Sequence, residues 1–269
     1  DNATIGKNYA ENFFNFISSR VLIDRTRSLE IGCGNGYFLS LLRKSGSTAI
    51  GIEPGSKNIN NKGENEAHII RGFFPQDLPN DYKMSDLIIA HAVLEHIVDP
   101  VDVLVDIKNS LMPGGHIFVA VPDCGPYLEI GDPSILLHEH YSYFTEHSLR
   151  RVLELAGFNQ IEIVNASYGN LLYASGVNAN ETASAINAVS IPRAEKAYIS
   201  KVNNVRNGMM RLASEKSIQL GIYCPARAIS VLPPWGNYRL FDDDLSIYHH
   251  FYPVWESWVE SRTTSMRIQ

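Results

Sequence analysis

Apolar residues follow two alternating spacings along the first two thirds of the chain. Segments with helical spacing alternate with short, almost wholly apolar runs, which are typical of buried strands. The expected strands are residues 27–31, 48–52, 68–72, 86–90, 116–121 and 160–164. The expected helices are residues 9–21, 37–44, 101–111 and 148–156. This alternation predicts an α/β fold, in which a parallel sheet is covered by helices on both faces.

The pattern changes after about residue 184. Residues 191–214 predict a long polar helix, and residues 219–223 and 238–241 predict two strands. This order indicates a second, small α/β unit, which is short for a complete sheet. We therefore expect two domains, residues 1–183 and 184–269. A solvated strand end explains the run Asp242-Asp243-Asp244 more simply than a cation site does.

The most informative chemistry lies where the first strand ends. Glu30 is followed by a turn in which Gly32, Gly34 and Gly36 alternate with other residues. Glycines let the backbone pass close to a ligand, because a Cβ atom would clash there. Glu30 could hold a positively charged amino group. Glu53 closes the second strand, where a carboxylate can accept hydrogen bonds from both hydroxyls of a ribose.

Two other interpretations fit this turn less well. The nicotinamide dinucleotide fingerprint has the spacing G-x-G-x-x-G, whereas this chain has G-x-G-x-G. A carboxylate two residues before the first glycine would also repel a pyrophosphate. The second alternative is a glycine turn that binds nothing. The pattern favours S-adenosylmethionine, which carries a ribose and an amino group but no phosphate.

With these residues, the chain resembles the class I S-adenosylmethionine-dependent methyltransferases over roughly residues 9–164. The resemblance implies a Rossmann-like sheet and methyl transfer. It places the methionine part, the ribose and the adenine against eight positions: Glu30, Gly32, Gly34, Glu53, Phe73, Phe74, His91 and Ala92. A core role for the two phenylalanines is an equally good interpretation. At His91 and Ala92 the implied contact is with the main chain.

A second informative segment, residues 137–145, is too polar for a buried strand and unusually aromatic for a loop. It follows the fifth strand, so it can overhang the cofactor site. Methylation of a hydroxyl or an activated carbon requires loss of a proton, and histidine suits this near neutral pH. We expect His140 to be the base, with Glu139 orienting it. Tyr141 and Tyr143 could bind acceptor oxygens.

Other interpretations of the polar residues in this segment, and of His96, remain open. Thr145 and its neighbours could simply cap the helix that follows. A zinc site from three histidines lacks a fourth ligand, so we expect no metal; the three are His138, His140 and His147. His96 lies close to the expected sulfonium and could touch the acceptor, although a structural role beside Glu95 is the simpler interpretation.

The second segment is similar to the His-Glu-His-x-Ser-Tyr-Phe segment of sugar C-methyltransferases, in which the Glu-His pair belongs to the active site. Glu139 and His140 match that pair, and Leu137 stands where the family has a tyrosine. The family's N-terminal module of clustered cysteines has no counterpart in this sequence. The resemblance implies a sugar, nucleotide sugar or glycan-like acceptor.

Composition narrows the possible partners and location. The net charge of −6 and the absence of a Lys/Arg run argue against a nucleic-acid backbone as the main partner. Three well-separated cysteines form neither a metal pair nor a disulfide framework, which fits a reducing cytoplasm. No apolar run approaches the roughly 18–20 residues of a membrane span. We expect a cytoplasmic enzyme with a small-molecule acceptor.

Two other functions remain compatible with the sequence. The first is an O- or N-methyltransferase of an unrelated small metabolite, in which His140 is merely structural. The second is a cofactor-binding scaffold in glycan assembly that does not turn over.

Overall fold

The computed structural model describes residues 2–55, 68–132, 135, 140–179, 192–214, 220–223 and 238–241. The chain divides into two compact units. The first comprises Asp1–Gly125 and Glu139–Ala188, and the second comprises Pro126–His138 and Val189–Gln269. The predicted domain boundary after residue 183 falls outside the described residues and stays a prediction.

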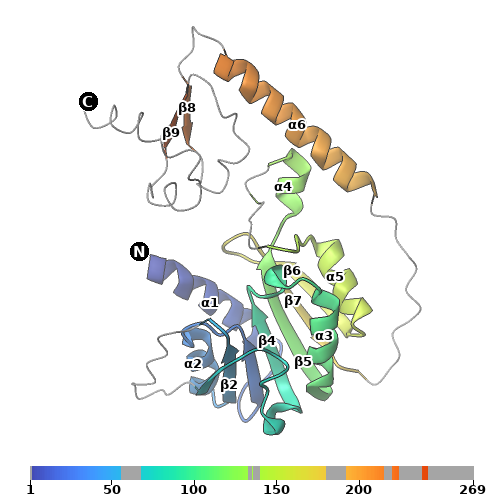
Figure 1. Cartoon of the computed structure of the whole chain (residues 1–269). Coiled ribbons are helices and arrows are strands. Elements are labelled where there is room, and N and C mark those ends of the chain that lie inside the picture. Colours follow the sequence, from blue (N-terminus) through green and yellow to red (C-terminus); the bar gives the residue numbers. More distant parts are fainter. Residues whose placement is uncertain are drawn as a thin grey trace. The chain divides into compact units, whose positions relative to one another are not determined.

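The first unit is built on a seven-stranded sheet with the order β3-β2-β1-β4-β5-β7-β6 (Figure 1). The neighbouring pairs from β3 to β5 are parallel, whereas β7 is antiparallel to both β5 and β6. The strands are β1 Arg27–Ile31, β2 Thr48–Glu53, β3 His68–Arg71, β4 Ser85–His91, β5 Leu111–Pro122, β6 Asn159–Asn165 and β7 Leu171–Val177. The predicted Rossmann-like α/β class is confirmed, but the expectation of a wholly parallel sheet is wrong.

The antiparallel end of the sheet follows from a short connection. Residues 166–170 join β6 to β7, and a parallel crossover needs a dozen or more residues. Gly169 and Asn170 both adopt positive φ angles, 83° and 55°, which glycine and asparagine accept more readily than other residues. The chain therefore turns back as a hairpin, and β7 inserts between β5 and β6.

A second correction concerns the start of β5. The predicted helix over residues 101–111 is α3, which spans Pro100–Asn109. The strand expected over residues 116–121 begins earlier, at Leu111, so β5 includes the run Pro113-Gly114-Gly115. The pairing of β4 with β5 is irregular between Ser85 and Leu87, which accommodates the proline and glycines.

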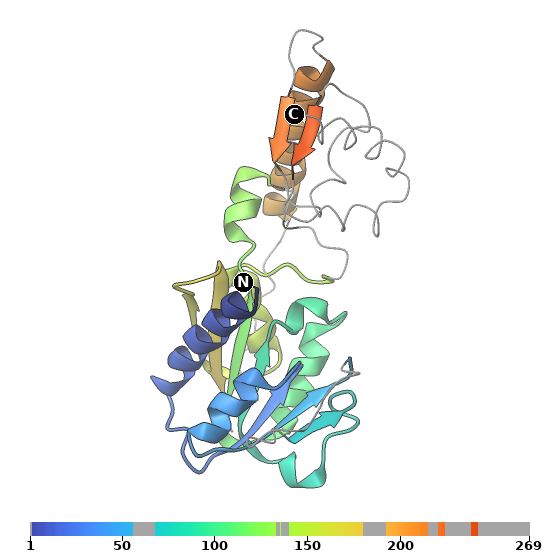
Figure 2. The same cartoon turned by 90° about the vertical axis from the view of Figure 1, so that its left-hand side faces the viewer.

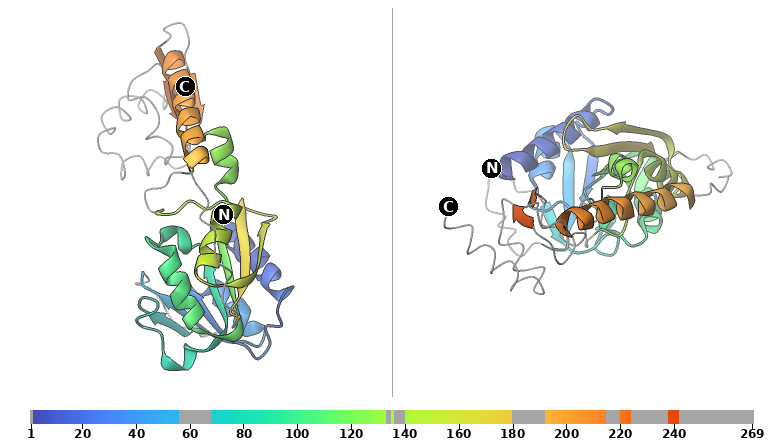
Figure 3. Two further views of the ribbon diagram at one scale, coloured as in Figure 1. Left: turned by 90° about the vertical axis from the view of Figure 1, so that its right-hand side faces the viewer. Right: turned by 90° about the horizontal axis from the view of Figure 1, so that it is seen from above.

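Helices cover both faces of this sheet, as the alternating pattern predicts. Helices α1 (Asn2–Ser18) and α2 (Tyr37–Lys44) lie on one face, and α3 and α5 (Glu146–Leu155) lie on the other (Figure 2, Figure 3). Two short 3-10 helices, η1 (Asn80–Tyr82) and η2 (Leu94–His96), flank β4.

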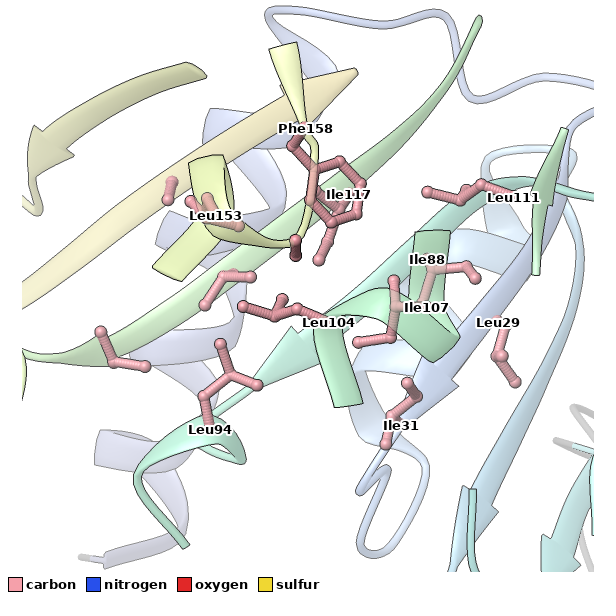
Figure 4. Close-up of a cluster of buried hydrophobic side chains, with 14 of the residues drawn as sticks. Leu29, Ile31, Ile88, Leu94, Leu104, Ile107, Leu111, Ile117, Leu153 and Phe158 are labelled. Atoms are coloured by element: carbon pink, nitrogen blue, oxygen red, sulfur yellow. The ribbon is translucent and has the colours of Figure 1, made fainter. Parts of the chain in front are cut away.

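The two helical layers bury separate hydrophobic clusters. Beneath α3 and α5, Leu104 and Leu153 point toward Ile88 and Ile117 of the central strands (Figure 4). All four side chains are fully buried, and burying each contributes about 1.5–3 kcal/mol. On the opposite face the cluster is more aromatic, and it includes Phe13, Phe16, Phe38, Phe118 and Tyr173. These clusters fix the strands whose carboxyl ends carry the site.

In the second unit, α6 (Pro192–Ser214) is the predicted long polar helix. Lys201 Nζ donates to the carbonyl of Glu129, the penultimate residue of α4 (Gly125–Ile130). Strands β8 (Leu220–Tyr223) and β9 (Tyr238–Phe241) pair in parallel, at the predicted positions. The run Asp242-Asp243-Asp244 lies outside the described residues. Within the described parts of both units, no helix has the length and apolar character that a membrane crossing requires.

Candidate cofactor and acceptor site

The candidate site lies at the carboxyl ends of β1, β2 and β4. Strand β1 pairs with β2 on one side and with β4 on the other. All three strands are parallel, so the loops that follow them emerge side by side at one edge. This is the edge at which ligands bind in open α/β sheets.

The glycine turn after β1 needs its glycines for two different reasons. Gly32, Gly34 and Gly36 have φ angles of 69°, 52° and 76°, in the left-handed region that disfavours side chains. A Cβ atom at Gly32 would also lie 2.6 Å from Cγ2 of Val93, in the loop after β4. At Gly34, an added Cβ would meet no other described residue within 4 Å, apart from the two neighbours of Gly34 in the chain. The first glycine therefore allows the turn and the β4 loop to pack together, and the second leaves open space.

Glu53 fastens the end of β2 to this turn. Its Oε2 accepts a hydrogen bond from Gly34 N at 3.0 Å, and its Oε1 accepts one from Gly55 N at 2.7 Å. Each carboxylate oxygen retains a second lone pair. The carboxylate is only partly buried, so it can still accept hydrogen bonds from ribose hydroxyls.

Glu30 is a buried carboxyl group without a cationic partner among the described residues. It is 3% exposed, and its Oε2 has no hydrogen-bond partner in the described part of the chain. Burial raises the pKa of Glu30 to about 8, a hydrogen bond from the Leu39 backbone opposes this, and the charge of Glu53 adds to it. A buried carboxyl with an unused oxygen fits the ammonium group of a methionine moiety, which would compensate its charge.

The two phenylalanines after β3 differ in their surroundings. Phe73 is 66% exposed, and its N–H donates to Asp77 Oδ2 at 2.8 Å. Phe74 is partly buried and packs against the hydrophobic cluster beneath α3 and α5. Only the ring of Phe73 is therefore open to a ligand over most of its surface.

His91 and Ala92 form the end of β4 and the start of its loop. The His91 ring lies 5.2 Å from the Phe13 ring and 6.2 Å from the Phe38 ring, measured between centroids. Burial lowers the pKa of His91 to about 4, so this imidazole is neutral at neutral pH. Ala92 has a φ of 55°, and its N–H donates to the Ala120 carbonyl at 2.9 Å. These contacts fix the backbone beside the glycine turn.

The structure brings His96 and His140 together, although 43 residues separate them in the sequence. The Tyr141 and Ser142 N–H groups donate to the carbonyl of Glu95 at 2.8 and 3.2 Å, which fastens this segment to η2. The rings of His96 and His140 meet edge to face, with 4.8 Å between centroids. Tyr143 lies 6.1 Å from His140 by the same measure.

Of the other predicted residues in this segment, Tyr141 is 65% exposed. Glu139 and His138 lie outside the described residues. The predicted capping role is confirmed for Thr145, whose hydroxyl accepts from Ser148 N at 3.2 Å. Ser148 Oγ in turn accepts from Thr145 N at 2.9 Å, completing a capping box for α5. Capping thus accounts for residues 145–148. It does not account for the contacts that residues 140–143 make with η2 and with one another.

Sequence reasoning assigned no site role to Glu95, which the structure places beside both imidazoles. We call Glu95, His96 and His140 the histidine cluster. One carboxylate oxygen of Glu95 and one nitrogen of each imidazole all lie within 4.8 Å of one another. Among the described residues these three are the set that could hold a metal ion, and His147 of the zinc hypothesis does not join it. The signal available in the sequence was the acidic residue directly before His96.

Glu95 is itself buried, with 2% of its surface exposed. Burial raises its pKa, while a backbone hydrogen bond and the charge of His96 act in the opposite direction. Its Oε2 has no hydrogen-bond partner in the described ranges of the chain. Like Glu30, it is a buried carboxyl whose second oxygen remains available.

Comparison with known proteins identifies the class. The model of a family described as a methyltransferase domain matches residues 6–163. An S-adenosylmethionine-dependent methyltransferase from Archaeoglobus fulgidus shares the fold, with a TM-score of 0.51 and 16% identity over 64% of this chain and 93% of that one. The chain therefore belongs to the methyltransferase-domain family and has the class I fold. The predicted family and cofactor, S-adenosylmethionine, are confirmed.

Curated relatives within this class act on different acceptors. The chain is 28% identical over 152 residues to the C-methyltransferase NovU of Streptomyces niveus, covering 54% of this chain and 36% of NovU. It is 29% identical over 115 residues to a ubiquinone biosynthesis O-methyltransferase of Rhizobium leguminosarum, covering 41% and 46%. A tRNA U34 carboxymethyltransferase of Campylobacter hominis is 28% identical over 166 residues, or 56% of each chain. The match thus spans about a third to just over half of each relative.

Proposed function

We propose that this protein transfers a methyl group from S-adenosylmethionine to a sugar, nucleotide sugar or glycan-like small molecule. The observation that carries the proposal is the docking of the His140 segment on η2. Helix η2 directly follows the β4 loop, and Val93 of that loop packs on the glycine turn. A cofactor on the turn and an acceptor at the histidine cluster would therefore be neighbours.

The cofactor contacts in this proposal follow the surroundings of each residue. Glu30 binds the ammonium group, and Glu53 accepts the ribose hydroxyls. The glycine turn, with Gly32 and Gly34, gives the methionine part room, and the backbone of His91 and Ala92 lies beside it. The exposed Phe73 ring stacks on the adenine, while Phe74 supports this loop from the core side.

When bound, the cofactor supplies an electrophilic methyl group on its sulfonium. The residues of the acceptor side orient the acceptor and remove its proton. An imidazole nitrogen of His140 would take the proton from the acceptor atom that receives the methyl group, and the surrounding residues would hold that atom in line for transfer. His96, Tyr141 and Tyr143 are proposed to bind acceptor oxygens, and Glu139 to orient His140.

Substitution of His140 tests this function. In His140→Gln, we expect turnover on a panel of nucleotide sugars to fall by about 100-fold or more, because general-base catalysis typically contributes 10²–10⁴-fold. Binding of S-adenosylmethionine, followed by calorimetry, should be unchanged. The matched control is His147→Gln, which removes an exposed imidazole of α5. Near-normal turnover in the His140 variant would contradict the proposal.

A second candidate acceptor class has an observation in its favour. The ubiquinone biosynthesis O-methyltransferases among the relatives match at identities similar to that of NovU. A hydroxylated small metabolite is therefore the alternative acceptor, and including phenols in the panel would distinguish it. Binding of the cofactor without turnover on any acceptor would instead favour a scaffold role.

The remaining proposals concern partners and location, and they rest on the net charge and on the buried free cysteines. A net charge of −6 means that the chain has no excess of basic residues to neutralise a tRNA backbone, so we do not extend the tRNA relative's acceptor to this chain. Cys33 and Cys124 are buried free thiols, which supports the proposed cytoplasmic location.

A further inference from the structure

We propose that Glu95 is a positioning residue of the acceptor site, whose buried carboxylate orients the imidazoles of His96 and His140 and stabilises the charge formed when His140 takes a proton. This inference rests on the proposed function, in which His140 is the base. It assigns a role to Glu95, which lies outside the sequence motif of residues 137–145.

The first argument is burial. Glu95 follows the fully buried Leu94 in η2 and is itself 2% exposed. A carboxylate so far from water is unfavourable unless it is paired with a cation or hydrogen-bonded. Its Oε2 nevertheless lacks a hydrogen-bond partner among the residues that the structure describes. Folding alone does not explain why a carboxylate oxygen is buried here without a partner, which points to a functional role for Glu95.

The second argument is proximity to both imidazoles. A carboxylate oxygen and one nitrogen from each ring lie within 4.8 Å of one another. The rings meet edge to face, so a proton gained by either one would lie near the same carboxylate. A negative charge at this range favours the protonated form of an imidazole.

The third argument is the double connection between Glu95 and the segment of His140. The Glu95 carbonyl accepts the N–H groups of Tyr141 and Ser142, so the residue fixes the backbone directly after His140. Its side chain lies beside the ring of the same histidine. One residue therefore determines both where this segment lies and which charge its imidazole encounters.

Two further ionisable groups, Asp123 and Cys124, directly follow β5, and the Cys124 thiol interacts electrostatically with both Asp123 and Glu95. The Asp123 carboxylate accepts hydrogen bonds from Gly125 N at 2.9 Å and Asn165 Nδ2 at 2.9 Å. Burial raises the pKa of the neighbouring Cys124 thiol to about 12, so this thiol stays uncharged. Neither group supplies a cation to Glu95, whereas the imidazoles of His96 and His140 lie beside it and can each gain a proton.

A divalent cation is the other ligand that a carboxylate and two imidazoles could bind. Ligand atoms about 2.1 Å from one cation lie at most about 4.2 Å apart. The three candidate atoms of the cluster lie within 4.8 Å of one another, a range that includes both a cation site and a proton network. A bound cation is therefore an outcome that the experiment must exclude.

The test follows the histidine ring signals by NMR in protein with ¹⁵N-labelled histidine, without an acceptor. In Glu95→Gln, we expect the apparent pKa of His140 to fall by about one unit, since an opposite charge at this distance shifts a pKa by 1–3 units. Glu95→Asp should restore part of that shift. Glutamine keeps the backbone carbonyl that holds Tyr141 and Ser142, and the signal of His147 serves as an internal control.

On the acceptor found with the panel, Glu95→Gln should lower kcat by about tenfold or more, with KM and cofactor affinity nearly unchanged. Unchanged ring titrations of His96 and His140 in a folded variant would overturn the inference, even if the wild-type protein proves active on sugars. Conversely, the NMR result stands if the acceptor is not a sugar. Selective broadening of both ring signals by micromolar Mn²⁺, with chelator-sensitive turnover, would also overturn it.

Discussion

The proposed cofactor side and the proposed acceptor side of this site are held together in different ways. On the cofactor side, the Glu53 carboxylate at the end of β2 accepts a hydrogen bond from Gly34 N in the turn after the adjacent parallel strand β1, and another from Gly55 N in its own loop. On the acceptor side, η2 is joined to a segment more than 40 residues further along the chain. The first arrangement can be inherited as a short motif, whereas the second depends on how a long connection folds back.

The largest effect is expected for Glu53→Ala, which tests the cofactor side. The change removes the acceptor of the Gly34 and Gly55 N–H groups and of the proposed ribose hydroxyls. Hydrogen bonds to a charged group contribute about 1.5–3 kcal/mol each, so affinity for S-adenosylmethionine should fall by about 100-fold or more, as measured by calorimetry. Glu11→Ala is the control, because its carboxylate bonds the Tyr37 hydroxyl instead. Equal affinities in both variants would show that Glu53 does not contact the ribose.

The two glycines of the turn offer a paired comparison. Gly32→Ala combines a positive φ with the close approach to Val93, while Gly34→Ala has the positive φ alone. We expect Gly32→Ala to lower the free energy of unfolding by about 1–3 kcal/mol more than Gly34→Ala does. Urea titration of both proteins measures the difference. If the two variants are equally stable, the β4 loop does not constrain the turn.

Glu30→Gln should change how stability depends on pH. Because the pKa of Glu30 rises from 4.5 to about 8 on burial, its protonated form stabilises the folded state. That contribution is complete below about pH 4.5 and is lost as the pH rises toward 8. The cofactor-free wild type should therefore lose a few kcal/mol of unfolding free energy across this range, relative to the glutamine variant.

Urea unfolding at several pH values checks this prediction. His91, with a pKa lowered to about 4, destabilises both proteins as the pH falls below 6.5, so the difference between them isolates Glu30. Parallel curves for wild type and variant would mean that the buried carboxyl finds compensation elsewhere.

The smallest effect is expected on the acceptor side, for Tyr143→Phe. Removing one neutral hydroxyl that binds an acceptor oxygen should raise the acceptor KM by about three- to tenfold, since such a bond contributes about 0.5–1.5 kcal/mol. Cofactor affinity should not change, which steady-state kinetics with calorimetry will show. A raised KM for the cofactor, rather than for the acceptor, would contradict the assignment of Tyr143 to the acceptor side.

The sequence predicted those features that depend on residues close together in the chain. The glycine turn and the strand ends at Glu30 and Glu53 could be predicted because each follows a recognisable apolar strand, while the cofactor contacts of these residues stay predictions. Strand β7 was not predicted, because its antiparallel course depends on the hairpin at Gly169 and Asn170 rather than on its own composition. Phe73 and Phe74 are indistinguishable by residue type, and only the structure shows which ring faces the core.

The histidine cluster shows more clearly which contacts could not be predicted from the sequence. The sequence marked His96 and His140 separately, but not that they touch. Glu95 could not be assigned, because its role depends on the docking of Tyr141 and Ser142 onto its carbonyl. Such a contact leaves no signal in the spacing of either segment, since backbone groups are the same at every residue.

The two N–H groups that hold the His140 segment on η2 have a consequence for how acceptor preference can change. Both bonds involve only the main chain, so the side chains of Tyr141 and Ser142 are not needed for the attachment. Tyr141 is also largely exposed. Substitutions at these two positions could therefore reshape the acceptor's surroundings while the anchoring of the segment persists. In evolution or in the laboratory, such a segment can acquire a new substrate without first losing its place in the fold.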